Sequence, residues 1–163
     1  DQIYRLYLKL GEEIFHPGFR TVFWPFFNHR YLQEPLKRAL QGALKDLKLG
    51  DLWEAAPRTD LVVTSFDVIE NRTRFLKPWK AEYSDWPLVK AVLASAAAPT
   101  YFPVVAGRYV DGGVGSFGNP TFIAAYEARF VLGWKPEETT LISVGTGRVA
   151  GGHRRRGPRG RAD

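Results

Sequence analysis

One stretch decides how this sequence folds: Tyr109-Val110-Asp111-Gly112-Gly113-Val114-Gly115-Ser116-Phe117-Gly118-Asn119-Pro120. A short strand predicted over 108–111 ends at Asp111, and a glycine-rich turn follows it. Asn119-Pro120 is then typical of a helix start, because asparagine caps a first turn and proline fits inside it. The stretch therefore predicts a strand, a turn and a helix, with a carboxylate at the carboxyl end of the strand.

Two interpretations of this stretch involve no catalysis. Asp-Gly is a strong β-turn signal, so Asp111 could be a turn residue. Residues 113–118 also match Gly-x-Gly-x-x-Gly, a pattern of dinucleotide-binding loops. In that pattern the helix begins inside the motif and points at the pyrophosphate, whereas here the helix start follows the last glycine. Asp111 would also place a carboxylate beside the phosphate, which disfavours dinucleotide binding.

The third interpretation is catalytic. Open α/β sheets bind ligands at the carboxyl ends of their strands, where Asp111 is expected to lie. Gly112 and Gly113 would free the backbone to present this carboxylate in a crowded site. An aspartate in such a place can act as general base toward a hydroxyl nucleophile.

Outward from this stretch, predicted strands and helices alternate along the chain. This alternation is typical of an α/β layered fold with a mainly parallel sheet. The small side chains of the helix at 86–97 would let it pack closely on a sheet or another helix. Helices are predicted over 2–15, 33–47, 86–97 and 120–132, and strands over 61–66, 74–79, 101–105, 108–111 and 141–144.

Residues 19–31 form an aromatic-rich segment interrupted by Pro25. We expect these aromatic side chains to pack in the core, because large apolar residues are usually buried. A patch that contacts lipid is the alternative.

Composition and charge exclude several classes of protein. The 163 residues are 45% hydrophobic, which is enough for a packed core, and the absence of cysteine excludes disulfides and thiolate zinc sites. The formal net charge is +6, but the arginine-rich segment 148–163 carries +5 of it. With only +1 on residues 1–147, we expect no nucleic-acid partner. We expect residues 148–163 to be a disordered tail.

Several motifs, in order, give the chain a family resemblance. They are Ala94-Ser95-Ala96-Ala97-Ala98-Pro99-Thr100-Tyr101-Phe102-Pro103, Asp111-Gly112-Gly113-Val114, Asn119-Pro120 and Ser143-Val144-Gly145-Thr146-Gly147. Their order and spacing resemble the patatin-like phospholipase family. The resemblance covers about residues 1–148.

The resemblance implies a three-layer α/β/α sandwich that hydrolyses acyl esters of lipids with a Ser-Asp dyad. Asp111 matches the aspartate of the dyad, and Gly112 and Gly113 match the glycines that follow it. The substrate would be a lipid acyl ester, such as a phospholipid or lysophospholipid. No metal or organic cofactor is implied, and the expected location is cytoplasmic with peripheral membrane contact.

The sequence departs from the family pattern at the nucleophile. The family serine lies in Gly-x-Ser-x-Gly, but none of the five serines here has glycine on both sides at that spacing. The glycine-rich loop that supplies the family's oxyanion hole is also absent. We therefore expect residues 1–147 to be the C-terminal portion of a patatin domain whose N-terminal part is missing, inactive on its own. A non-catalytic patatin-like binding or regulatory module is the alternative.

Overall fold

The computed structural model describes residues 8, 10–16, 18–23 and 26–145. The arginine-rich segment 148–163 and part of the first predicted helix lie outside these residues, although 10–14 are helical. The elements are, in chain order, α2 (Phe19–Val22), α3 (Gln33–Leu44), α4 (Leu49–Glu54), β1 (Val63–Asp67), β2 (Arg72–Leu76), α5 (Ala81–Ser84), α6 (Leu88–Ala96), β3 (Tyr109–Asp111), the 3-10 turn η2 (Gly112–Gly115), α7 (Thr121–Tyr126), the π-helical turn η3 (Glu127–Val131) and the 3-10 turn η4 (Pro136–Glu138).

The sheet in the described residues has the strand order β2-β1-β3, and both pairings are antiparallel. The expectation of a mainly parallel sheet is therefore wrong for this part of the chain. For β1 and β2 the reason is the connection between them, which spans only residues 68–71. A connection this short can form only a hairpin, because parallel neighbours need a crossover of a dozen or more residues. The coarser expectation of an α/β fold holds.

Two predicted strands do not form in the structure. Residues 101–105 are irregular, apart from one isolated bridge between Val105 and Tyr109. Residues 141–144 have no ladder partner in the described part of the chain, and Ile142 and Val144 are 78% and 89% exposed. A strand is stabilised by hydrogen bonds to its neighbour, so a strand-like sequence without a neighbour stays irregular.

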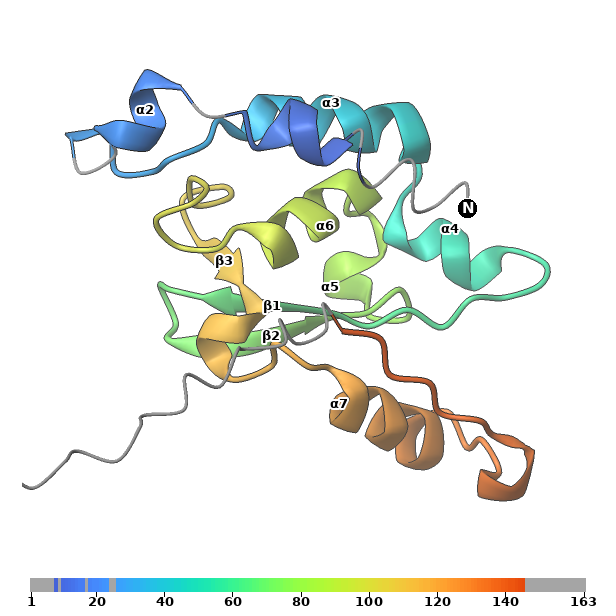
Figure 1. Ribbon diagram of the computed structural model, residues 1–163. Helices are drawn as coiled ribbons and strands as arrows, with labels where there is room; N and C mark the ends of the chain where they lie inside the picture. Colours follow the sequence, from blue (N-terminus) through green and yellow to red (C-terminus); the bar gives the residue numbers. More distant parts are fainter. Residues whose placement is uncertain (1–7, 9, 17, 24–25, 146–163) are drawn as a thin grey trace, which may run out of the picture.

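Helix α6 is packed between the sheet and α3, as Figure 1 shows. Its alanines allow this close approach: Ala91 and Ala94 are fully buried, and Ala97 just beyond the helix is 1% exposed. The core around them is apolar and contains Leu49, Val63, Leu76, Tyr83, Leu88, Val89, Leu93, Val105 and Tyr109. The small-residue helix predicted from the sequence is thus the element on which both neighbouring layers pack.

Helix α7 lies on the other side of the sheet from α6 (Figure 1). The helix predicted over 120–132 is present, but its second half, η3, is π-helical. A buried ion pair between Lys77 and Glu127 links it to the chain that follows β2. Removing either partner would leave a buried charge unpaired, so this pair holds η3, and α7 with it, against the chain that follows β2.

The aromatic segment does not pack as expected. Phe19, Phe23 and Phe26 are 67%, 43% and 84% exposed, so core packing is the wrong interpretation for these three side chains. In the described residues of this segment the one α-helix is α2, and its four residues offer little surface to pack against the body.

Candidate active site

Asp111 is the last residue of β3 and is held from both sides by the backbone. It is paired in register with Ser65 of β1, and its N–H donates to the carbonyl of Ala97 at 3.0 Å. The side chain is half-buried. Its Oδ1 accepts a hydrogen bond from the N–H of Gly113 at 2.6 Å. The carboxylate therefore lies at the end of the strand, as both the turn and the catalytic interpretation expect.

Behind Asp111 lies the hydroxyl of Ser65, which is completely buried. This hydroxyl is 2.8 Å from the carbonyl of Val110 and 3.1 Å from the carbonyl of Ala94. A hydroxyl has one proton, so the two carbonyls share it in a three-centre hydrogen bond. Ser65 thus joins β1, β3 and α6 directly beside Asp111. The sequence analysis placed Ser65 in the predicted strand 61–66 but did not anticipate this contact.

The loop after Asp111 rests directly on the hairpin, because two of its glycines have no side chain. A Cβ on Gly112 would lie 2.7 Å from the Cβ of Thr64 and 2.8 Å from its carbonyl carbon. A Cβ on Gly115 would lie 2.9 Å from a ring carbon of Phe66, with the hydroxyl of Thr73 closer still. Real Cβ atoms do not approach other atoms so closely, so these positions admit only glycine without rearrangement.

Further contacts tie the loop to β1 and β2. The hydroxyls of Thr64 and Thr73 each lie 3.4 Å from a loop carbonyl, and the ring of Phe117 meets that of Phe75 edge to face at 5.0 Å. Gly113 contributes in another way, since its N–H binds Asp111 and its Cβ would come within 3.0 Å of the same oxygen. Gly115 was not singled out from the sequence, although it lies in the same glycine run.

The start of α7 argues against dinucleotide binding. The helix begins at Thr121, three residues after Gly118, and Asn119 accepts a hydrogen bond from the Thr121 N–H at 3.1 Å. The helix N-terminus therefore lies outside the glycine motif and does not point into it. Among the described residues, no group of three or more His, Cys, Asp or Glu side chains could hold a metal ion.

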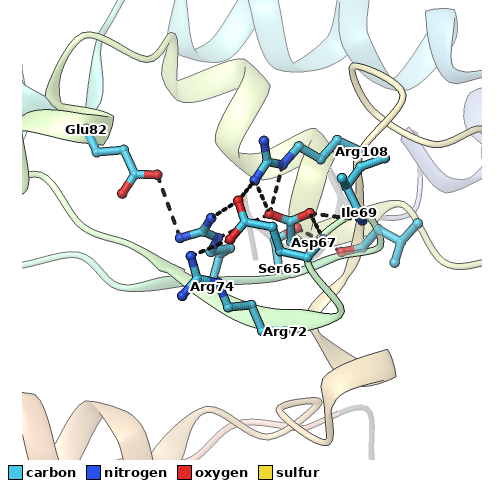
Figure 2. A network of polar contacts seen from close by, with 9 residues as sticks. Ser65, Asp67, Ile69, Arg72, Arg74, Glu82 and Arg108 are labelled. Carbon is cyan, nitrogen blue, oxygen red and sulfur yellow. Dashed lines mark hydrogen bonds and ion pairs between the residues drawn. The ribbon is translucent and has the colours of Figure 1, made fainter.

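A polar network at the far end of β1 holds β3 against the hairpin (Figure 2). At its centre is Asp67, which is fully buried. Its Oδ1 accepts the N–H groups of Ile69 and Glu70, both at 3.1 Å, which closes the turn after β1. Its Oδ2 accepts hydrogen bonds from Nε of Arg108 at 2.8 Å and from Nε of Arg74 at 3.2 Å. One carboxylate thus connects the turn, β2 and the residue before β3.

The electrostatics of this network follow from its geometry. Burial by itself would raise the pKa of Asp67, but hydrogen bonds from Arg108, the Glu70 N–H and Arg74 hold that pKa well below its ordinary value of 3.8. Hydrogen bonds to Asp67 likewise raise the pKa of Arg108. Asp67 is therefore ionised in the folded protein at neutral pH and in mild acid.

Comparison with known proteins identifies a family. The model of the family described as patatin-like phospholipase matches residues 1–125. The match includes the loop after Asp111 and ends inside α7, before the last of the motifs quoted above. No curated protein matches the chain. In the described residues, no helix is long and apolar enough to cross a membrane.

Replacing Gly112 with alanine tests the close contact of the loop with β1. We expect Gly112→Ala to lower the free energy of unfolding by roughly 1–3 kcal/mol, because the new methyl group overlaps the Thr64 backbone. The control is Gly42→Ala in α3, where a Cβ would meet nothing within 4 Å. That change should raise the free energy of unfolding by about 0.5–1 kcal/mol, since alanine favours helix. Urea denaturation measures both, and equal effects would contradict the close contact.

Replacing Asp67 with asparagine tests the network. Near pH 7 we expect Asp67→Asn to lower the free energy of unfolding by roughly 3 kcal/mol, because the two arginines lose their carboxylate. The pKa of Asp67 is lower in the folded state than in the unfolded state, where it is near the ordinary value of 3.8. The ionised carboxylate therefore stabilises the fold fully above pH 3.8, and this stabilisation is lost as the pH falls below that value. The difference in the free energy of unfolding between Asp67→Asn and the wild type should therefore become smaller in acid. Denaturant titrations at several pH values measure this difference.

Glu82→Gln serves as the control for this variant. Glu82 is exposed and reaches Arg74 only at 3.8 Å, so its loss should change the free energy of unfolding by less than about 0.5 kcal/mol. A pH-independent effect of Asp67→Asn would show that the carboxylate charge is not what stabilises this end of the sheet.

Proposed function

Because this chain belongs to the patatin-like phospholipase family, we propose that it supplies the catalytic base, Asp111, of a lipid acyl hydrolase with a Ser-Asp dyad. The observation that carries the proposal is the position of Asp111 at the end of β3. Its backbone is held by Ala97, its carboxylate by Gly113, and the loop after it by close contact with the hairpin. Catalytic bases need such fixed positions, because small displacements reduce proton transfer strongly.

In the proposed reaction the carboxylate of Asp111 accepts the proton of the serine hydroxyl while the serine oxygen attacks the ester carbonyl. The tetrahedral intermediate collapses to an acyl-enzyme, and the alcohol part of the lipid leaves with the proton that Asp111 returns to it. Asp111 then takes a proton from water, whose oxygen attacks the acyl-enzyme. As the fatty acid leaves, Asp111 returns this proton to the serine oxygen, which restores the serine hydroxyl and the carboxylate. Nucleophile, base and oxyanion donors are all protein groups, so the reaction requires no metal or organic cofactor.

We propose that the serine and the oxyanion loop come from sequence other than these 163 residues. Ser116 is the serine nearest in sequence to Asp111, but Val114 and not glycine lies two residues before it, so it does not fit the Gly-x-Ser-x-Gly turn of the family nucleophile. The exposed residues 141–144 support a larger sheet, because their strand-like pattern has no neighbour in the described part of the chain. Added strands at this position would complete the three-layer α/β/α sandwich of the family.

A non-catalytic patatin-like module is the second candidate. The hydrogen bond from the Gly113 N–H to Asp111 favours it as much as the enzyme, because aspartate makes the same contact in ordinary turns. The two candidates differ in what they expect when the carboxylate is removed.

The 163-residue chain should not hydrolyse esters on its own. Loss of the nucleophile costs on the order of 10⁴–10⁶ in rate in enzymes of this kind. The measurement is release of p-nitrophenol from a p-nitrophenyl ester by the purified chain. Turnover that disappears in Ser116→Ala would identify Ser116 as the nucleophile and refute the assignment made here.

In the protein that joins this chain to its serine, Asp111→Asn should reduce kcat by roughly 10²–10⁴ while substrate binding and the melting temperature stay close to the wild type. Asparagine has almost the same shape and can keep the Gly113 hydrogen bond, but it cannot accept the serine proton. Asp85→Asn, at an exposed aspartate paired with Lys48, should leave kcat unchanged. If Asp111→Asn keeps most of its kcat, Asp111 is a turn residue and the dyad assignment fails.

A further inference from the structure

The end of β3 is joined to α6 by a closed ring of hydrogen bonds around Ser65. The Ser65 hydroxyl lies 2.8 Å from the carbonyl of Val110 and 3.1 Å from that of Ala94 in α6. Farther along the chain, the carbonyl of Ala97 accepts the N–H of Asp111 at 3.0 Å. Because Val110 and Asp111 are adjacent, these contacts run from β1 through α6 to β3 and back. We call them the Ser65 ring.

The Ser65 ring lies in the interior of the protein. Ser65 and Ala94 are completely buried, and Ala97 and Val110 are 1% and 4% exposed. Ala94 is also one of the last four residues of α6, whose carbonyls a helix cannot pair internally. Water does not reach such a place easily, so a hydrogen-bond donor that is removed from it is not replaced. The hydroxyl is therefore the member of the ring whose loss has the clearest consequence.

Strand β1 holds the region around Asp111 from both faces of the sheet. On one face, Thr64 and Phe66 lie against the glycines of the loop that follows Asp111. Side chains alternate along a strand, so Ser65 between them points to the opposite face, toward α6. The glycine contacts place the loop on the sheet, and the Ser65 ring sets how far the end of β3 lies from α6.

The two ends of β3 are held by different side chains of β1. Asp67 holds the beginning through Arg108, the residue before the strand (Figure 2). Ser65 is paired with Asp111 in the register of β1 and β3, so it acts at the end. Removal of the Ser65 hydroxyl should therefore loosen one end of β3 and leave the other held.

We propose that Ser65 is a positioning residue for Asp111, the base of the proposed dyad. Its hydroxyl acts through the carbonyls of Val110 and Ala94, which fix the main chain from which the Asp111 carboxylate projects. The proposal rests on the proposed function, because this position matters for catalysis only if Asp111 accepts the serine proton. A displacement of about 1 Å can reduce the rate of a positioned reaction on the order of 100-fold. A hydroxyl that never meets the substrate thus contributes to kcat.

The first test measures amide hydrogen exchange by NMR in the 163-residue chain. In Ser65→Ala the N–H of Asp111 should exchange about tenfold faster relative to the N–H of Val68, which donates to the carbonyl of Arg108 at the other end of β3. A factor of about ten corresponds to the loss of one buried hydrogen bond. Ser65→Cys keeps a weak donor and should show a smaller change. Equal acceleration at both amides, or none at Asp111, would overturn the proposal.

The second test is kinetic and uses the protein that joins this chain to its serine. Ser65→Ala should lower kcat about tenfold or more and leave KM unchanged, because the base moves and the substrate contacts do not. Leu49→Ala is the control. Leu49 is fully buried where α4 packs on α5, so its truncation costs at least as much stability as one hydrogen bond. Below the melting temperature of both variants, Leu49→Ala should keep the wild-type kcat.

An equal loss of kcat in Leu49→Ala would show that Ser65 acts only through stability, and full kcat in Ser65→Ala would refute its role. Failure of the dyad gives a different result. If Ser65→Ala keeps its kcat while Asp111→Asn loses it, the dyad stands and the role of Ser65 fails. If Asp111→Asn keeps its kcat, the dyad fails, and Ser65 with it as a residue that positions a base.

Discussion

The hydroxyl of Ser65 holds together the three elements that meet behind Asp111. It is buried in the middle of β1 and is shared by a carbonyl at the end of α6 and the carbonyl of Val110. Two main-chain carbonyls from different elements are thus joined through one small side chain. A larger residue would push α6 from the sheet, and an apolar one would leave both carbonyls without this donor. The position of β3 relative to the hairpin depends on this contact.

The carboxylate of Asp67 closes the β1–β2 hairpin and ties it to β3. Asp67, at the end of β1, receives four hydrogen bonds that close the turn and recruit Arg74 and Arg108. Arg108 comes directly before β3, so the network fixes the beginning of that strand and Ser65 fixes its end. A buried carboxylate is costly unless it is fully paired, and here two guanidinium groups and two N–H groups pair it. The loop that follows β3 then rests on the sheet face that these contacts hold together.

The sequence was sufficient for some of these features and not for others. The helix over 33–47, the small-residue helix and the strand ending at Asp111 follow from local patterns, and the structure contains all three. The antiparallel pairing of β1 and β2 was not predicted, because an alternation of strands and helices does not reveal that residues 68–71 form a tight turn. Ser65, Thr64 and Thr73 were missed as partners of the Asp111 loop, because nothing in their local sequence marks a contact made across strands. The exposure of Phe19 and Phe26 contradicts an average tendency of aromatic residues, and α2 is too short to overcome it.

For the Ser-Asp dyad proposed above, the close packing of the Asp111 loop has a particular use. In a triad, a histidine between the acid and the nucleophile can adjust its position, whereas a dyad aspartate must reach the serine directly. Its carboxylate therefore has to be placed to within a fraction of an ångström by the backbone that carries it. Gly112 and Gly115 achieve this by removing the space that a side chain would occupy, so the loop has one way to lie on β1 and β2. The glycines of this motif thus provide close packing more than backbone freedom, since neither has a positive φ.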